Sequence, residues 1–400
     1  MTKSKEVINE RISIDGGNSS IKVIYNNNFI RYENYFAKNV EIDYSVIDIE
    51  NNLDEELRNF LNVKFTWHNG EEDQIEQDFL FGEIATNYSA VAEERLNTDK
   101  SDDITLNMTS ILSAVNFIIE NTDKSKLEEE MEFNLALGTG LPYHEYKEIE
   151  RREKYKKHFL GQHIIEFKDP RYQALSKVKK AIVNINSVDV ESEGISALDT
   201  TVSTQGLITD NEDKDLLIDT VISMIDIGGY TTDVVSGVVR ERKHGYILER
   251  QDNICKGYRL GVNSEVQKAI SEIIKGLGAK ITSNFKLTVR DILKAEERQG
   301  RMHGIVNRKF NINSTDYTYP RYEELGKEIA NQYIQLLVQA AQIDNVGKVY
   351  ISGGGSMNPK VAEALVDTLI SRGIEKEIIE ILSSPHPMYV NSVGYYLAIK

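Results

Sequence analysis

The stretch VISMIDIGGYTTDVV, residues Val221–Val235, is the most informative part of the sequence. It opens with apolar and β-branched residues, which predict a buried strand ending at the acid Asp226. Adjacent glycines at Gly228 and Gly229 let the backbone turn and approach a ligand closely, and Tyr230 and Thr231 continue the turn. Successive N–H groups in such a turn form an anion site, and the acid suits hydrated Mg²⁺. The pattern therefore predicts a phosphate-binding hairpin, although a hairpin turn that binds no ligand can have the same Gly-Gly sequence.

A second copy of this pattern lies near the start of the chain. The stretch ISIDGGNSSIKVI, residues 12–24, again runs from an apolar strand through an acid, Asp15, and a small polar turn into an apolar strand. Aligning Asp15 with Asp226 pairs Gly17 with Gly228 and Ser20 with Thr231. Because the copies lie about half a chain apart, they predict equivalent points in two similar domains that clamp one polyphosphate through a shared Mg²⁺.

Composition narrows the class of protein. At 400 residues the chain is long enough for two domains with sizeable cores. Its one cysteine, Cys255, argues against a disulfide framework or a zinc cluster. A net charge of −16 argues against direct binding to DNA or to an anionic membrane. The polar N-terminus and the lack of a long apolar run predict a cytoplasmic protein.

Several further segments have clear patterns. Helical spacing from Ile104 predicts a core-facing helix, whereas the stretch from about 26 to 103 predicts only a small peripheral subdomain with some hairpin content. Residues 188–198 resemble a strand end, an acidic turn and a helix start. Residues 346–352 predict a strand, followed by a glycine-rich turn and a helix from about Pro359 to Ser371, an arrangement typical of a ligand turn.

The order of these motifs resembles that of the actin, Hsp70 and sugar-kinase superfamily. The spellings IDIGGYTTDV, GLPYHEY and VNSVGYYL are most similar to the ParM-type bacterial actins. The matching segments are two phosphate motifs, an adenosine motif and two connecting elements: Asp15–Lys22, Met224–Asp233, Val349–Ser356, Glu193–Leu198 and Asn391–Leu397.

The resemblance implies an α/β protein with the actin-like fold, in which two related α/β domains have a nucleotide cleft between them. The first domain would comprise residues 1–195 and 386–400, with the peripheral subdomain at about 26–103. The second would comprise residues 196–385, with a smaller subdomain at about 265–320. The C-terminal helix is expected to pack back on the first domain.

The resemblance also implies a ligand, ATP with Mg²⁺, and a role for each motif residue. Asp15 and Asp226 would hold the metal through water. Lys22 would neutralise phosphate charge, although it also fits an exposed place on a return strand. The phosphates would receive donors from Gly16, Gly17, Asn18, Ser19, Ser20, Gly228, Gly229, Tyr230 and Thr231. Adenosine would lie against Gly353, Gly354, Gly355 and Ser356.

Glu193 occupies the position at which the family places the residue that orients the attacking water. A carboxylate there suits this role, because phosphoryl transfer depends mainly on positioning and charge neutralisation. Two neighbouring acids, Asp189 and Glu191, are the alternatives. In that case Glu193 would only cap the helix that starts near Gly194.

The function implied is that of a bacterial ATPase that polymerises into filaments and segregates plasmid DNA. It would assemble with copies of itself and reach a centromere-like DNA site through a small DNA-binding adaptor, without binding DNA or a membrane directly. Two other functions fit the same fold: a small-molecule kinase acting on a sugar or acid, and an ATP-binding switch that does not polymerise.

Overall fold

The computed structural model describes residues 7–18, 20–40, 42, 58, 61–68, 74–82, 85, 99–204, 217–242, 245–277, 287–297, 305–307, 312–383 and 386–399. The chain divides into two compact units, which are described separately below. Unit 1 comprises residues 1–196 and 391–400, and unit 2 comprises residues 197–390. The second crossing of the chain thus lies at residue 391, whereas the sequence placed it at residue 386.

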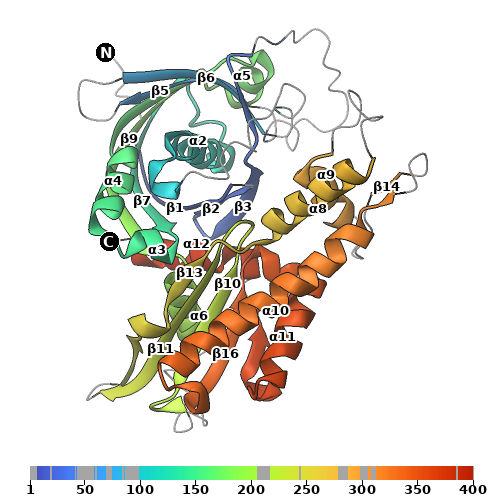
Figure 1. The fold of residues 1–400 in the computed structure, drawn as a ribbon. Coiled ribbons are helices and arrows are strands. Elements are labelled where there is room, and N and C mark those ends of the chain that lie inside the picture. Colours follow the sequence, from blue (N-terminus) through green and yellow to red (C-terminus); the bar gives the residue numbers. More distant parts are fainter. Residues whose placement is uncertain are drawn as a thin grey trace. The chain divides into compact units, whose positions relative to one another are not determined.

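Unit 1 is built on a mixed sheet that has nine strands within the described residues (Figure 1). Their order is β3-β2-β1-β7-β9-β8-β5-β6-β4, with β1, β7 and β9 parallel to one another. The strands are β1 (Val7–Gly16), β2 (Ser20–Tyr25), β3 (Asn28–Glu33), β4 (Phe36–Lys38), β5 (Leu61–His68), β6 (Gln74–Phe81), β7 (Glu130–Leu141), β8 (Gly161–Phe167) and β9 (Lys180–Ser192).

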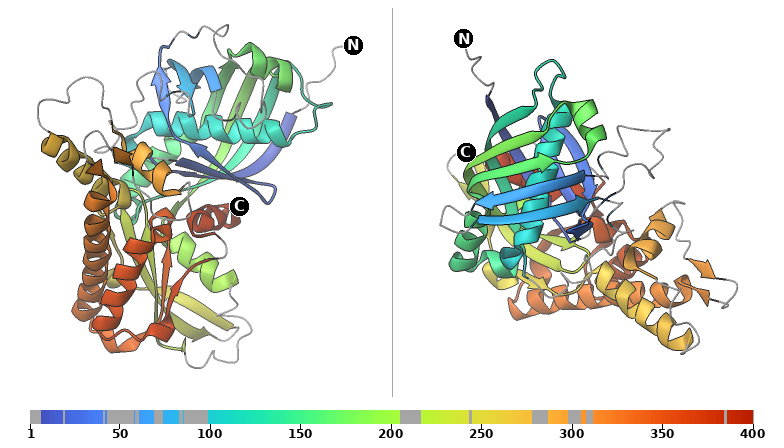
Figure 2. Two further views of the ribbon diagram at one scale, coloured as in Figure 1. Left: turned by 90° about the vertical axis from the view of Figure 1, so that its right-hand side faces the viewer. Right: turned by 90° about the horizontal axis from the view of Figure 1, so that it is seen from above.

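Helix α2 (Ile104–Asn121) fills one side of this sheet, as Figures 1 and 2 show. Its N-cap is Asp103, whose carboxylate accepts a hydrogen bond from the Leu106 N–H at 2.8 Å. Residues from Leu106 to Ile119 are all buried, which is expected of a helix enclosed by a sheet. The predicted helix from Ile104 is therefore present and faces the core.

The stretch predicted to form a peripheral subdomain instead extends the main sheet, to the extent that the structure describes it. Strand β5 pairs antiparallel with β8, and β6 and β4 continue from β5. Phe65, Trp67, Phe79 and Phe81 are buried in the same hydrophobic core as α2. The alternation of aromatic and polar residues in these strands places the aromatic rings on the core face.

Shorter helices complete unit 1: the single turn η4 (Lys100–Asp102), α3 (Tyr143–Tyr146), α4 (Ile149–Phe159), α5 (Pro170–Ser176) and the C-terminal α12 (Val390–Ala398). Helix α12 packs directly on β1 and β7. The Ser13 hydroxyl donates to the Ser392 carbonyl at 2.8 Å, and a Cβ on Gly138 would meet the Tyr395 carbonyl at 2.3 Å. The C-terminal helix thus returns to the first unit, as expected.

Unit 2 contains a second mixed sheet, which among the described residues has the order β12-β11-β10-β16-β17, with β13 paired to β11. Strands β10 and β16 are parallel, and β10 and β11 form an antiparallel hairpin. The strands are β10 (Val221–Ile227), β11 (Thr232–Arg242), β12 (Gly245–Arg250), β13 (Lys256–Tyr258), β16 (Val346–Ser352) and β17 (Ile379–Ile381). A separate small hairpin joins β14 (Val306–Asn307) to β15 (Ile312–Asn313).

In unit 2, α10 and α11 lie side by side, and α8 contacts α10 (Figure 2). The helices of the unit are α6 (Ile195–Thr204), α8 (Val262–Leu277), α9 (Val289–Glu297), α10 (Thr315–Gln339) and α11 (Pro359–Ser371), with single turns η5 (Asp252–Ile254), η7 (Ile343–Asn345), η8 (Gly354–Met357), η9 (Lys376–Ile378) and η10 (Pro387–Tyr389). The predicted strand and helix on either side of the glycines at 353–355 are both present. Across the described residues, no helix is long and apolar enough to cross a membrane.

Candidate functional site

The two predicted hairpins have the same backbone geometry at equivalent positions. In the first hairpin, between β1 and β2, the Gly17 N–H donates to the Ser20 carbonyl at 3.0 Å. In the second, between β10 and β11, the Gly228 N–H donates to the Thr231 carbonyl at 2.8 Å. These are the residues that the sequence alignment pairs, so the internal repeat extends to the hydrogen bonding of the turn.

An aspartate ends the first strand of each hairpin, but its cross-strand neighbour differs. Asp15 is 6% exposed and pairs in register with Lys22, whereas Asp226 is 8% exposed and pairs with Asp233. Cross-strand neighbours lie within reach of each other on one face of a hairpin. Only the first hairpin therefore provides its own cation opposite the acid.

In unit 1, two lysines approach the Asp15 carboxylate from different elements. Lys22 Nζ lies 2.7 Å from Asp15 Oδ2, and Lys100 Nζ, from η4, lies 3.6 Å from Asp15 Oδ1. Burial alone would raise the pKa of Asp15, but the two ammonium groups lower it below its usual value. Asp15 is thus held as a carboxylate, and Lys22 is not the exposed return-strand residue of the alternative interpretation.

Glu193 joins the same cluster. It lies in the turn between β9 and α6, where its N–H donates to the Leu141 carbonyl at 2.8 Å. Its Oε1 lies 2.5 Å from Lys100 Nζ. Burial would lower the pKa of Lys100, but the charges of Glu193 and Asp15 raise it above its ordinary value. The structure therefore brings together the predicted metal-binding and water-orienting acids of unit 1.

The turn that carries Glu193 is also fixed from the C-terminal helix. The Gly194 N–H donates to Asn391 Oδ1 at 3.0 Å, and α6 begins one residue later, at Ile195. Asp189 and Glu191, the alternative acids, are partly buried positions along β9. Because Glu193 contacts Lys100 in the Asp15 cluster, the geometry favours Glu193 over both.

Lys100 is the site residue that sequence reasoning missed. It lies 85 positions after Asp15 and follows a polar stretch with no recognisable motif. A lysine in such a stretch is usually solvated, yet the side chain of Lys100 is 9% exposed. One feature of the sequence could have pointed to Lys100, namely that it lies just before Asp103, the N-cap of α2. The N-terminal turn of α2 packs near the end of β1.

In unit 2, the second aspartate lies beside the predicted adenosine turn. The Ser352 hydroxyl, at the end of β16, donates to Asp226 Oδ1 at 2.9 Å. The next residue, Gly353, has a φ of +85°, and the single turn η8 follows. Within that turn, the Ser356 hydroxyl donates to the Gly353 carbonyl at 2.8 Å. The predicted metal-binding acid and adenosine turn of unit 2 are therefore neighbours.

The second hairpin also packs against the start of α8. The Asn263 N–H donates to the Gly229 carbonyl at 2.7 Å, and a Cβ on Gly261 would meet the Tyr230 nitrogen at 2.5 Å. A Cβ on Gly355 would likewise meet Ile227 Cγ2 at 2.5 Å. The hairpin is thus held at close range by the loop before α8 and by η8, which keeps its backbone groups in one arrangement.

For the remaining predicted residues of the two hairpins, the structure gives the degree of burial, with one exception. Asn18, Tyr230 and Thr231 are partly buried, Gly16 and Ser20 are buried, and Ser19 lies outside the described residues. The predicted groups assemble within each unit: Asp15, Lys22 and Glu193 in unit 1, and Asp226 with the glycine-rich turns in unit 2.

Gly353→Ala is expected to destabilise unit 2. Its φ of +85° is costly for alanine, and the added Cβ would meet the Ile227 carbonyl at 2.3 Å. We expect a loss of about 2 kcal/mol or more in the free energy of unfolding, measured by denaturant titration. Gly354→Ala is the matched control, since its Cβ would meet nothing within 4 Å and should leave the fold intact.

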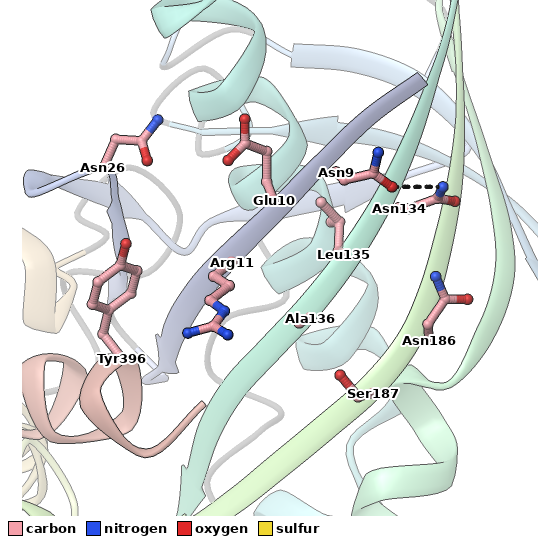
Figure 3. A pocket seen from close by; sticks show the side chains of 10 residues that line it. All are labelled: Asn9, Glu10, Arg11, Asn26, Asn134, Leu135, Ala136, Asn186, Ser187 and Tyr396. Atoms are coloured by element: carbon pink, nitrogen blue, oxygen red, sulfur yellow. Dashed lines mark hydrogen bonds between the residues drawn. The ribbon is translucent and has the colours of Figure 1, made fainter. Parts of the chain in front are cut away.

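A separate pocket lies on the sheet of unit 1 beside α12 (Figure 3). It contains none of the predicted phosphate, metal or adenosine residues. Two amides that line it pair across β1 and β7, where Asn134 donates to Asn9 at 3.0 Å, and Asn184, outside the pocket, donates to Asn134 at 3.1 Å. These cross-strand hydrogen bonds explain the arrangement of the amides without a ligand.

Residues 13–195 match the family described as the actin like proteins N terminal domain. No curated protein matches the chain. A solved 15-stranded ParM filament from Clostridium botulinum is 18% identical, with a TM-score of 0.69 over 98% of each chain. The archaeal actin homologue Ta0583, in complex with ADP, is 15% identical, with a TM-score of 0.61 over 97% of this chain and 98% of that one.

Bacillus thuringiensis ParM with ATP is also similar, at 15% identity and a TM-score of 0.56 over 96% of each chain. At such identities the likeness shows the fold, and it confirms the fold class predicted from the motifs. The protein therefore has the actin-like fold with two α/β domains, and its residues 13–195 match the model of the actin-like N-terminal domain.

Proposed function

We propose that this protein is an ATPase that assembles into nucleotide-dependent filaments and segregates plasmid DNA. The observation that carries the proposal is the repeated hairpin, with equivalent N–H to carbonyl bonds at Gly17 and Gly228, each preceded by a buried aspartate. Duplicated anion-binding turns of this kind suit a polyphosphate. Similar folds solved as a ParM filament and with ADP or ATP support the same conclusion.

The residues present fit ATP with Mg²⁺. Asp15 and Asp226 are buried carboxylates at strand ends, and such oxygen donors suit a hydrated Mg²⁺. The Gly353 backbone adopts a conformation that side chains resist, and the space beside Gly354 is open at Cβ, as a turn facing a ligand requires. When bound, Mg²⁺–ATP would supply an activated phosphoryl group whose negative charge the metal partly neutralises.

Each residue of the cluster then has a chemical task. The backbone N–H groups of both hairpins would donate to phosphate oxygens, and Lys22 would add a positive charge near them. Glu193 would orient a water and accept its proton. Phosphoryl transfer requires little beyond this positioning. Hydrolysis would change the nucleotide state and so the preference for the assembled form.

Copies of this chain are the first partner that we propose, and a small DNA-binding adaptor is the second. A net charge of −16 disfavours direct contact with DNA at physiological salt, so a separate basic protein would make that contact. The proposal places the filament in the bacterial cytoplasm, where a plasmid and its adaptor would be available.

Light scattering and phosphate release, recorded together on the purified chain with Mg²⁺–ATP, test the proposal. Scattering should rise above a critical protein concentration and then decay as phosphate accumulates. ATP turnover without scattering at any concentration would contradict the filament and favour a small-molecule kinase or a monomeric switch. A screen of sugar and acid acceptors for phosphorylated product would then separate these two alternatives.

A further inference from the structure

We propose that Lys100 is a positioning residue that holds Glu193 and Asp15 in their working arrangement. This inference rests on the proposed function, because it assigns a task in the same reaction. The Lys100 ammonium lies 2.5 Å from Glu193 Oε1 and 3.6 Å from Asp15 Oδ1. The exposed fractions of the three side chains are 9%, 14% and 8%, so water screens these charges weakly.

A buried carboxylate fixes the backbone that carries Lys100. Glu145, on α3, is 1% exposed, and it accepts hydrogen bonds from the Lys100 N–H at 3.0 Å and the Ser101 N–H at 2.8 Å. An acid at the start of a helical turn satisfies N–H groups that the turn itself leaves without partners. Because a buried charge is costly unless it is paired, Glu145 strongly favours this one position of η4.

Two ion pairs from α4 hold the same turn from its outer side. Arg151 Nη1 lies 2.5 Å from Asp99 Oδ2, and Lys154 pairs with Asp102. The first pair is partly buried and the second is exposed, and ion pairs that solvent reaches contribute little stability each. Together with Glu145 they nevertheless fix the turn at both ends. We refer to Glu145, Arg151 and Lys154 as the η4 clamp.

The η4 clamp holds the Lys100 ammonium between the carboxylates of Asp15 and Glu193. Without that ammonium the two carboxylates would repel each other, and the side chain of Glu193 would have no fixed orientation. Lys22 does not replace this contact, since it pairs with the other oxygen of Asp15, at 2.7 Å. Lys100 is therefore placed to control the orientation of the water-orienting acid more than the affinity for nucleotide.

Three variants of the full-length chain test this inference. Lys100→Met removes the charge and keeps the length, Lys100→Arg keeps the charge, and Lys179→Met removes a lysine of unit 1 outside the η4 clamp whose side chain is 51% exposed. The measurements are single-turnover phosphate release, the affinity for a fluorophore-labelled ATP with Mg²⁺, and thermal unfolding without nucleotide.

Lys100→Met should slow hydrolysis by about tenfold or more while its affinity for labelled ATP changes by less than about threefold, because positioning acts on the rate. Lys100→Arg should recover part of the rate, and Lys179→Met should match the original chain. In thermal unfolding, Lys100→Met and Glu193→Gln should be non-additive in the protein without nucleotide, since the two groups are in contact there.

The inference is overturned if Lys100→Met hydrolyses ATP at the original rate, or if its rate and affinity fall together. If that variant does not fold, Glu145→Gln serves instead, since it weakens the contacts that position η4 but keeps the lysine at position 100. An unchanged rate in a folded Glu145→Gln protein would overturn the inference. Failure of the proposed function looks different, because the original chain itself would then neither bind nor hydrolyse ATP.

Discussion

Asp226→Ala is expected to lower the affinity for Mg²⁺–ATP by about 10- to 100-fold, the range typical when a group that orients a metal's water ligands is lost. Asp226 ends β10, is buried, and accepts a hydrogen bond from the Ser352 hydroxyl. Alanine would remove the metal's acceptor and leave that hydroxyl without its present partner. Titration of labelled ATP, with and without Mg²⁺, measures the effect.

The dependence on Mg²⁺ separates metal binding from a loss of structure. Without Mg²⁺, Asp226→Ala and the original chain should bind labelled ATP with similar affinity, because the carboxylate then has no metal to hold. Glu249→Ala is the control, since Glu249 is an exposed acid of the same unit. A variant that binds Mg²⁺–ATP as tightly as the original chain would rule out the metal role of Asp226.

Asp15→Ala extends this test to the other unit. If both hairpins serve one nucleotide, Asp15→Ala should weaken Mg²⁺–ATP binding by itself, and the double variant should lose less than the sum of the two single losses. Two binding phases in the same titration, of which each single variant weakens only one, would indicate two independent sites. This comparison checks the prediction that the repeated motif forms one clamp.

The parts of the site that can be predicted from the amino-acid sequence are those set by local backbone chemistry. Paired glycines after an acid specify a tight turn, and so the equivalence of Gly17 and Gly228 is recognisable from residue order alone. The third turn is equally clear, because Gly353 follows an apolar strand and Pro359 begins a helix after its Asn358 cap.

The parts that could not be predicted depend on pairing between distant segments. The amino-acid sequence of β5 does not indicate that this strand pairs with β8, which places Phe65 and Trp67 in the hydrophobic core of unit 1. Lys100 is similar, since its position depends on Glu145 from a helix 45 residues later. Local sequence patterns predict strands and turns, whereas the contacts of a side chain with distant segments depend on the whole fold and are not predicted by these patterns.

Glu193→Gln is expected to slow ATP hydrolysis by about 100-fold or more, because an amide cannot accept a proton from water. Its size is unchanged, and the amide can still approach Lys100, so nucleotide binding and assembly should persist. Scattering recorded after addition of Mg²⁺–ATP should therefore rise normally and then stay high. This separation of assembly from disassembly is the result that a purely structural role for Glu193 would not produce.

Two neighbouring acids provide the comparison that the sequence left open. Asp189→Asn and Glu191→Gln change acids on the strand that leads to Glu193, whereas the 2.5 Å contact with Lys100 belongs to Glu193 itself. We therefore expect both variants to release phosphate at close to the original rate. If Glu191→Gln slowed hydrolysis and Glu193→Gln did not, the water-orienting role would pass to Glu191, and the Lys100 contact would be only a structural ion pair.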